Sequence, residues 1–267
     1  MNVKHIYKSL PLDEFGRANY SEEENETWSF LLKRQNDLVK TRASREFLKG
    51  VELLQFTNQI PQHYEITEIL KSHTGWGVEP VPALIQPEEF FSLLSKKRFP
   101  AANFIRTKDD IDYIQEPDVF HELFGHCPLL TNAAYAEFMH EYGKLALMTD
   151  KKTQMRMFRL FWFTIEFGLI NEDGKTLAYG GGILSSKSEV IYSVESEIAE
   201  RRPLDPIEAL LTPFRIDILQ PIYFVINSYD DLFKLIAKDP LKMAKESFLQ
   251  PDFPAKFERK KKLLVSE

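Results

Sequence analysis

Residues 116–130, EPDVFHELFGHCPLL, set ionisable side chains inside one of the most apolar stretches of the chain. Two of the six histidines, His121 and His126, lie here together with Asp118 and Glu122. Burying an ionisable group without a partner costs several kcal/mol, so such groups are buried paired, hydrogen-bonded or bound to a metal. Any fold of this chain must therefore bring partners to this segment.

The spacing of the two histidines restricts what they can share. His126 follows His121 by five positions, so on a continuous α-helix their side chains would diverge by about 140°. The zinc-protease pattern HExxH is one residue shorter and diverges by only about 40°. Gly125 and Pro128 predict that the helix loosens or ends here, which lets both rings face one point. The spacing argues against the zinc-protease motif and leaves a shared metal open.

A third group occurs 40 residues later, in RMFRLFWFTIEFGL. At helical spacing, Glu166 shares an apolar face with Phe158 and Trp162, while Arg159 lies on another face. A carboxylate on such a face needs a cation, and one metal ion would satisfy Glu166 and the two histidines together. Two histidines and one carboxylate form the facial triad of non-haem Fe(II) oxygenases.

The residues alone leave three interpretations open. Each histidine taken singly is more often a hydrogen-bonded core residue than a ligand, and Glu166 alone is more often salt-bridged. In that case the chain is a non-catalytic helical interaction protein. A zinc hydrolase with Glu122 as general base is another alternative, and the extra residue between the histidines disfavours it.

The patterning indicates a mostly α protein with small β-hairpins and strands, an α+β class. Ser21-x-x-Glu24 is a capping box that predicts the start of a long helix. Further helices are expected near residues 64–72, 88–97, 132–148, 152–169, 187–195, 205–211 and 228–238. Strands are expected at 101–107 and 222–226, and a hairpin at 171–182 turns at Asp173-Gly174.

No repeat or low-complexity linker divides the chain, so we expect an arm at 1–20, one domain at 21–240, and a tail at 241–267 packed on or trailing that domain. A net charge of −6 disfavours nucleic acid as a partner. The chain contains no run of about 18 apolar residues, so the sequence predicts no membrane-spanning helix. The single cysteine, Cys127, excludes an internal disulfide. These features predict a cytoplasmic protein.

Three ordered motifs carry a resemblance: PDVFHELFGHCPLL, FWFTIEFGL and AYGGGILSS. Together they resemble the pterin-dependent aromatic amino acid hydroxylases, over roughly residues 17–235, the catalytic domain of that family. The similarity is strongest to short bacterial members that act on phenylalanine. Weaker similarity extends to NYSEEENETW and TGWGVEPVPALI.

The resemblance implies roles for individual residues. The iron ligands of the family match His121, His126 and Glu166. The substrate-binding positions match Arg106, which would grip the amino acid carboxylate, Trp162 as an aromatic wall, Ser185, Ser186, and Asp118 as a residue that orients the Arg106 region. The pterin-binding positions match Phe90, which would stack on the pterin, the backbone of Ala83, Leu84 and Ile85, and Glu122. Ala83 stands where the family pattern leads us to expect glycine.

The implied reaction is hydroxylation of L-phenylalanine to L-tyrosine with Fe(II), a tetrahydropterin and dioxygen. Tyrosine or tryptophan hydroxylation within the same family is the alternative. Ile216 favours phenylalanine, because tyrosine-selective relatives carry an acidic side chain at the matching position, although neighbouring Asp217 would reverse this on a shift of register. The length leaves no room for the regulatory domain and tetramerisation helix of animal relatives, so we expect a monomer.

Overall fold

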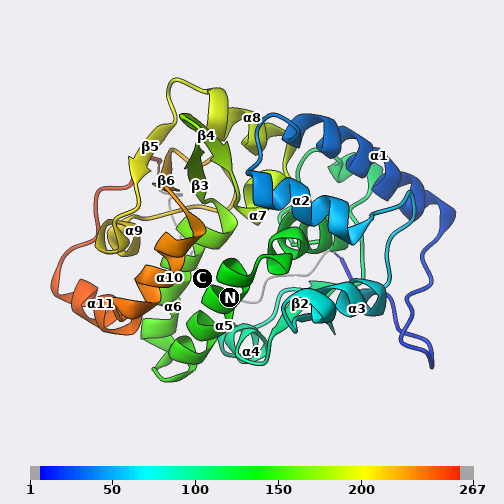
Figure 1. Ribbon diagram of the computed structural model, residues 1–267, viewed down its shortest axis with the longest axis horizontal. Helices are drawn as coiled ribbons and strands as arrows, with labels where there is room; N and C mark the ends of the chain where they lie inside the picture. The colour runs from blue at the N-terminus through cyan, green and yellow to red at the C-terminus, as the bar shows by residue number, and fades with distance from the viewer. Residues whose placement is uncertain (1–6, 259–267) are drawn as a thin grey trace, which may run out of the picture.

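Two small sheets set within many helices form the architecture of this computed structural model, which describes residues 7–258 (Figure 1). The longer helices are α1 (Glu22–Val39), α2 (Arg45–Leu54), α3 (His63–His73), α4 (Pro87–Leu94), α5 (Ala133–Leu147), α6 (Lys151–Phe161), α8 (Lys187–Glu195) and α10 (Tyr229–Ala237). Shorter helical turns are η1 (Lys108–Asp110), η2 (His121–His126), η3 (Cys127–Thr131), η4 (Trp162–Glu166), α7 (Gly181–Leu184), α9 (Pro206–Leu211), α11 (Pro240–Glu246) and η5 (Ser247–Leu249). The expected mostly α class with small strands is confirmed.

The strands pair in two separate sheets. Parallel strands β1 (Gly77–Val81) and β2 (Arg98–Ala102) flank α4, so 77–102 is a β-α-β unit. The second sheet has the order β4-β3-β6-β5 and comprises β3 (Leu169–Glu172), β4 (Lys175–Ala178), β5 (Glu200–Pro203) and β6 (Ile222–Ile226). Strands β3 and β4 form the antiparallel hairpin that the sequence predicts, and positive φ angles at Asp173 and Gly174 make its turn.

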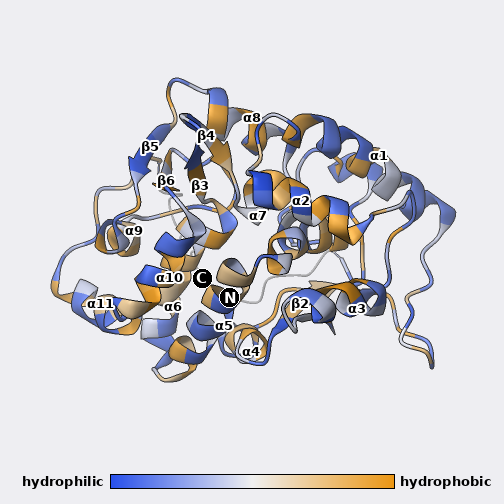
Figure 2. Ribbon diagram, in the orientation of Figure 1, coloured by the Kyte–Doolittle hydropathy of each residue, from blue (hydrophilic) through white to orange (hydrophobic). Residues whose placement is uncertain are grey.

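Capping side chains define several helix starts. Ser21 Oγ accepts a hydrogen bond from the Glu24 N–H at the start of α1, and Glu24 in turn accepts one from the Ser21 N–H, as the capping box predicts. Asp150 and Asn132 cap α6 and α5 in the same way. In Figure 2, α1 and α2 carry hydrophilic and hydrophobic residues on different sides of the same helix. Their apolar sides, including Trp28, join one continuous core.

Three predicted elements have wrong bounds. The hairpin expected at 171–182 spans 169–178, and residues 181–184 form α7 instead. The strand expected at 101–107 is β2, three residues earlier, and it contains Pro100. The helix expected at 152–169 ends as an α-helix at Phe161, continues as a π-turn to Glu166, and is followed by β3.

Helices α2 and α11 and strands β1 and β5 had no counterpart in the sequence prediction. Within 7–258, no helix is long and apolar enough to cross a membrane. The proposed division into an arm, a domain and a tail stays a prediction, and residues 1–6 and 259–267 of those end segments lie outside the described residues.

Candidate active site

Two π-turns carry the three side chains that the sequence singled out. In η2 and η4 the backbone is wound more loosely than in an α-helix, and the Phe167 N–H donates to the Trp162 carbonyl five residues earlier at 2.8 Å. Residues five apart lie about one turn apart in a π-helix, so His121 and His126 project from the same side of η2. The loosening expected near Gly125 is thus present, and it explains the five-residue spacing.

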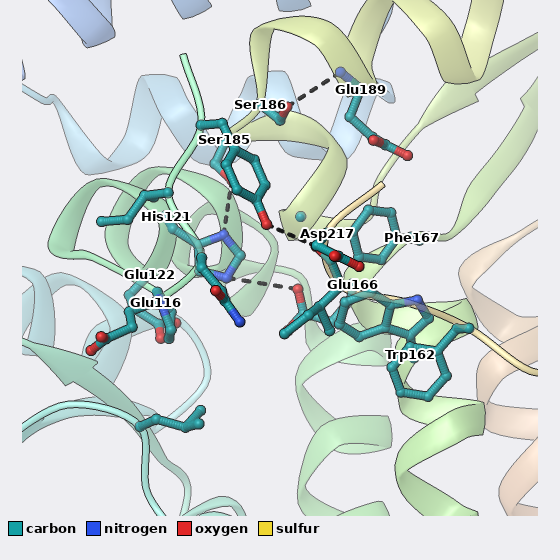
Figure 3. Close-up of a pocket in the computed structure, with 18 of the residues that line it drawn as sticks. Glu116, His121, Glu122, Trp162, Glu166, Phe167, Ser185, Ser186, Glu189 and Asp217 are labelled. Carbon is teal, nitrogen blue, oxygen red and sulfur yellow. Dashed lines mark hydrogen bonds and ion pairs between the residues drawn. The ribbon is translucent and has the colours of Figure 1, made fainter. Parts of the chain in front are cut away.

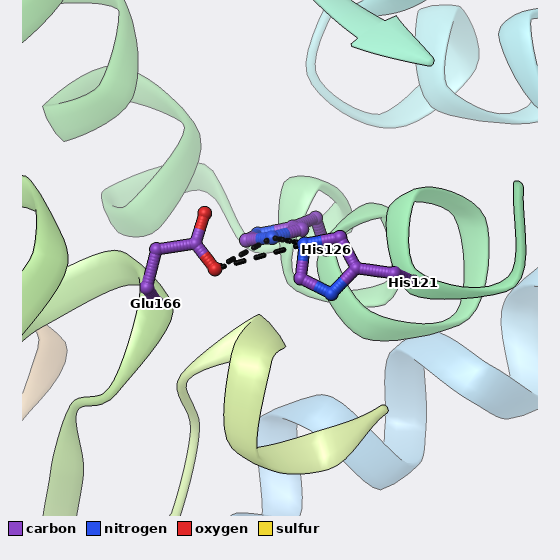
Figure 4. Close-up of side chains that lie close together, drawn as sticks. All are labelled: His121, His126 and Glu166. Atoms are coloured by element: carbon purple, nitrogen blue, oxygen red, sulfur yellow. Dashed lines mark hydrogen bonds and ion pairs between the residues drawn. The ribbon is translucent and has the colours of Figure 1, made fainter. Parts of the chain in front are cut away.

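The ligand atoms of the three residues converge on one point (Figure 4). The Nε2 atoms of His121 and His126 are 3.2 Å apart. Glu166 Oε2 lies 3.3 Å from His126 Nε2 and 3.7 Å from His121 Nε2. Ligands on adjacent positions around one ion, each about 2.1 Å from it, are separated by about 3 Å, so the three atoms fit a single metal ion.

The protonation states also suit a metal. Burial lowers the pKa of His121 to about 4, against the attraction of Glu166, so its ring is neutral at pH 7. Burial alone would raise the pKa of Glu166, but the adjacent His126 and His121 hold it below its usual value. A neutral imidazole and an ionised carboxylate are the forms that bind metals. Two imidazoles and a carboxylate leave coordination positions open, as in Fe(II) oxygenases.

Ser185 fixes the tautomer of His121. The Ser185 hydroxyl donates to the Gly181 carbonyl at 2.8 Å, so its oxygen accepts the bond from His121 Nδ1–H at 2.9 Å. The Nε2 lone pair of His121 is then free to face the other two ligand atoms. Gly181 also packs against His126, where a Cβ would lie 2.4 Å from the ring. Among the described residues, the buried His126 Nδ1 has no hydrogen-bond partner, which disfavours a purely structural role for this histidine.

A cavity of about 780 Å³ opens onto the convergence point, a volume typical of small-molecule sites (Figure 3). Most of the residues that the sequence assigned to the site line it: Ala83, Leu84, Ile85, Phe90, Arg106, His121, Glu122, Trp162, Glu166, Ser185 and Ser186. His126 and Asp118 lie behind the cavity wall. Ser186 also accepts a hydrogen bond from the Glu189 N–H and so caps α8.

Asp118 links Arg106 to the first histidine. Its carboxylate accepts from Arg106 Nε at 2.8 Å and from Arg106 Nη2 at 2.9 Å, and it also accepts the His121 backbone N–H at 3.0 Å. Burial would raise the pKa of Asp118, but Arg106 holds it below the usual value. Arg106 Nη1 takes no part in this fork. The arrangement orients one buried guanidinium along the cavity wall.

Aromatic rings form another side of the cavity. Trp162 stacks on Phe214 at a centroid distance of 4.4 Å and lies tilted by 31° against Phe167 at 4.5 Å. Across the cavity, Phe90 meets Phe161 edge to face at 5.2 Å. Burial raises the pKa of Glu122 well above its usual value, and the nearby Glu166 and Asp118 raise it further.

Sequence reasoning missed several residues of the cavity and its supports. Phe214, Phe167, Tyr113 and Glu189 line the cavity, and Gln220 supports its wall from behind. Phe214 and Gln220 lie in a segment without helix or strand, so no periodicity marks their facing side chains. Among these residues, only Phe167 could have been found from the sequence, because it directly follows the predicted metal ligand Glu166.

Comparison with known proteins agrees with this geometry. The family model for biopterin-dependent aromatic amino acid hydroxylases matches residues 4–257. Phenylalanine-4-hydroxylase of Pseudomonas aeruginosa is 47% identical over 94% of this chain and 97% of its own. The phenylalanine hydroxylase structure from Legionella pneumophila superposes with a TM-score of 0.91 at 47% identity, covering 94% of this chain and all of that one. The phenylalanine hydroxylase structure from Chromobacterium violaceum with bound Fe(III) superposes with a TM-score of 0.86 at 39% identity. The match covers 92% of this chain and 89% of that one. The chain therefore belongs to the biopterin-dependent aromatic amino acid hydroxylase family.

Proposed function

We propose that this protein is a phenylalanine 4-monooxygenase that converts L-phenylalanine and dioxygen to L-tyrosine with Fe(II) and a tetrahydropterin. The observation that carries the proposal is the convergence of His121, His126 and Glu166 at one end of a cavity that Arg106 and Phe90 also line. Membership of the family and the iron-bound relative support the same cofactors.

The two histidines and Glu166 would hold the iron. Bound iron and reduced pterin together supply the activation of dioxygen for insertion of one oxygen atom into an aromatic ring. The protein's contribution is to keep His121 in the ligating tautomer through Ser185 and to keep Glu166 ionised. His126 is 1% and Ser185 3% exposed, and their burial restricts water at the reacting end of the cavity.

Arg106 would bind the carboxylate of the amino acid. Its Nε and Nη2 are occupied by Asp118, which leaves Nη1 to donate to a substrate carboxylate. Because Asp118 also accepts the His121 N–H, the carboxylate-binding group and the first iron ligand are held by the same side chain. This shared anchor would fix the substrate's position relative to the metal.

The aromatic wall would hold the substrate ring. Trp162 lies between Phe167 and Phe214, so the wall is rigid and apolar. On the other side, Phe90 would stack on the pterin, with the backbone of 83–85 and the Glu122 carboxyl nearby. The methyl of Ala83 replaces the expected glycine hydrogen, and Ala83 is partly exposed where it lines the cavity.

Ile216 supports phenylalanine as the substrate. Its apolar side chain lines the cavity, whereas the neighbouring carboxylate of Asp217 is gripped by Arg215 through two hydrogen bonds of 2.9 Å. An acidic group that is already neutralised offers little to the hydroxyl of a tyrosine substrate, whereas an apolar wall suits an unsubstituted ring.

The test is turnover by the purified, iron-loaded protein with a tetrahydropterin in air. We expect tyrosine to form from phenylalanine, with kcat/KM for phenylalanine above that for tyrosine or tryptophan. Absence of any hydroxylated amino acid would contradict the proposal. A clear preference for tyrosine or tryptophan would contradict the assignment of phenylalanine as the substrate.

We also infer that the enzyme acts as a monomer in the cytoplasm. The residues proposed to hold iron, pterin and substrate surround one cavity within a single chain. The single cysteine, Cys127, is buried and free, as is usual in a reducing compartment. Sedimentation equilibrium should give a mass near 31.2 kDa, and a mass near four times larger would contradict the monomer.

A further inference from the structure

The segment between α9 and β6 forms a cavity wall without regular secondary structure. Residues 212–221 contain no helix or strand, yet Phe214, Ile216 and Leu219 line the cavity. Backbone carbonyls near a protein interior need partners. The Pro221 carbonyl accepts from the Glu200 N–H of β5 at 3.0 Å, whereas the carbonyls of Arg215 and Ile218 accept from a side chain.

Gln220 supplies those bonds. It is 1% exposed, and each of its side-chain polar atoms is paired. Its Nε2 donates to the carbonyls of Arg215 at 2.8 Å and Ile218 at 3.0 Å. Its Oε1 accepts the indole N–H of Trp162 at 3.2 Å. One buried amide thus ties the irregular segment to η4, the turn that also carries Glu166.

The glutamine is itself anchored from α8. Its backbone N–H donates to Glu189 Oε1 at 3.0 Å, and the Tyr223 hydroxyl donates to the same oxygen. Glu189 and Tyr223 are buried, and Figure 3 shows Glu189 on the far side of the cavity from Glu122. The resulting chain runs from Glu189 through Gln220 to Trp162, so the position of the indole depends on Gln220, which does not line the cavity.

We propose that Gln220, held by Glu189 and Tyr223, is a positioning residue that locks the Trp162 indole and the segment 215–218 into one wall of the amino acid pocket. The inference rests on the proposed function, because the wall would face the substrate ring. Stacking on Phe214 and contact with the tilted ring of Phe167 restrict the tilt of the indole, and the bond to Gln220 restricts its rotation between those rings. Without Gln220 the buried N–H would be unpaired, and the indole or the segment would shift to reach another partner.

The test compares Gln220→Met with a matched control, Gln154→Met. Gln154 is also buried and donates to one carbonyl, that of Ala146 at 3.2 Å, but it does not line the cavity. The indole ¹H–¹⁵N resonances of the metal-free proteins report the hydrogen bond directly. Trp28, which donates to the Thr57 carbonyl at 2.9 Å, is the internal reference.

In Gln220→Met we expect the Trp162 indole proton to move upfield, while the Trp28 resonance stays in place. KM for phenylalanine should rise about tenfold, the size expected for one lost hydrogen bond, with KM for the pterin within about twofold. The fraction of oxidised pterin that yields tyrosine should fall. The Gln154→Met control should leave both indole resonances, both KM values and the yield of tyrosine per oxidised pterin unchanged. An unshifted Trp162 resonance, or an unchanged KM for phenylalanine, would overturn the proposal.

Tyr223→Phe keeps the test decisive if Gln220→Met does not fold, since it removes only the hydroxyl that braces Glu189. The same resonance should move in the same direction, and KM for phenylalanine should rise about twofold to threefold. A folded Tyr223→Phe protein with neither change would also overturn the proposal. Wild-type turnover separates the two claims: an inactive wild type defeats the proposed function, whereas an active one with unaltered variants defeats this inference alone.

Discussion

The inner end of the cavity and its rim are built in different ways. At the inner end, His126 is 1% exposed, and the three converging residues stand on π-turns that the core surrounds. At the rim, Leu84 is 56% and Tyr113 53% exposed, and both lie in segments without helix or strand. Buried networks thus hold the groups at the inner end of the cavity, whereas few hydrogen bonds hold the groups at its rim. Substitutions at the inner end should therefore have much larger effects than substitutions at the rim.

The largest effect is expected from Glu166→Ala. The variant leaves two imidazoles without the third ligand, so it should lose stable Fe(II) binding, and tyrosine formation should fall at least about a thousandfold. Metal content by atomic absorption and turnover with excess Fe(II) measure the two effects. His140→Ala is the matched control, since His140 lies on α5 outside the cavity lining, and it should keep both. A Glu166→Ala protein with full iron content would show that the inner end is not the metal site.

Asp118→Asn should come next. The substitution removes half of a fully buried ion pair with Arg106 and should destabilise the fold by about 3–5 kcal/mol. The released guanidinium should also raise KM for phenylalanine more than KM for the pterin. Thermal unfolding and steady-state kinetics measure these changes. Asp13→Asn breaks an exposed pair with Arg17 and should leave the melting temperature unaltered. Equal losses of stability in Asp118→Asn and Asp13→Asn would show that the buried ion pair stabilises the fold no more than the exposed one.

The sequence predicted the inner end better than the rim. Burial logic alone selected His121, His126 and Glu166, because ionisable groups in apolar segments need partners, and the structure places them together. Gly125 and Pro128 also predicted that the helix loosens or ends near them, and the structure has the π-turn η2 there. By contrast, Arg106 and Phe90 came from family resemblance, since one arginine and one phenylalanine carry no signal of their own.

The missed elements have physical reasons. Helix α2 contains Gly50, a poor helix former, which is needed because a Cβ there would lie 2.1 Å from the Pro128 carbonyl oxygen. Strand β5 has the sequence ERRP, which shows no alternation of apolar and polar residues. Its pairing with β6, and not its own sequence pattern, makes it a strand. The helix expected at 152–169 was too long because a π-turn leaves no mark in a 3.6-residue pattern. Gln220 was missed because its partners are brought together only by the tertiary fold.

A smaller effect is expected from Glu189→Gln, as a change in pH dependence. Burial raises the pKa of Glu189 to about 7, although the bonds from Tyr223 and Gln220 lower it. Between about pH 4.5 and 7 the unfolded chain has lost this proton and the folded protein keeps it, so stability falls as pH rises through this window, by up to about 3 kcal/mol. The variant should remove that part of the slope in denaturant titrations. Glu195→Gln, exposed on the same helix, should keep the wild-type slope. Parallel profiles for all three proteins would mean that Glu189 is ionised in the folded state.

The smallest effect is expected at the rim, from Tyr113→Phe. The Tyr113 hydroxyl donates to the Ile216 carbonyl at 3.3 Å and joins two irregular segments across the cavity mouth. The bond is long and the side chain is half exposed, so water can replace it at little cost. KM for phenylalanine should change by less than about twofold and the melting temperature should stay constant, as in the control Tyr64→Phe on α3. A rise in KM as large as that of Asp118→Asn would reverse the comparison, because the mouth of the cavity would then contribute as much to substrate binding as the buried guanidinium.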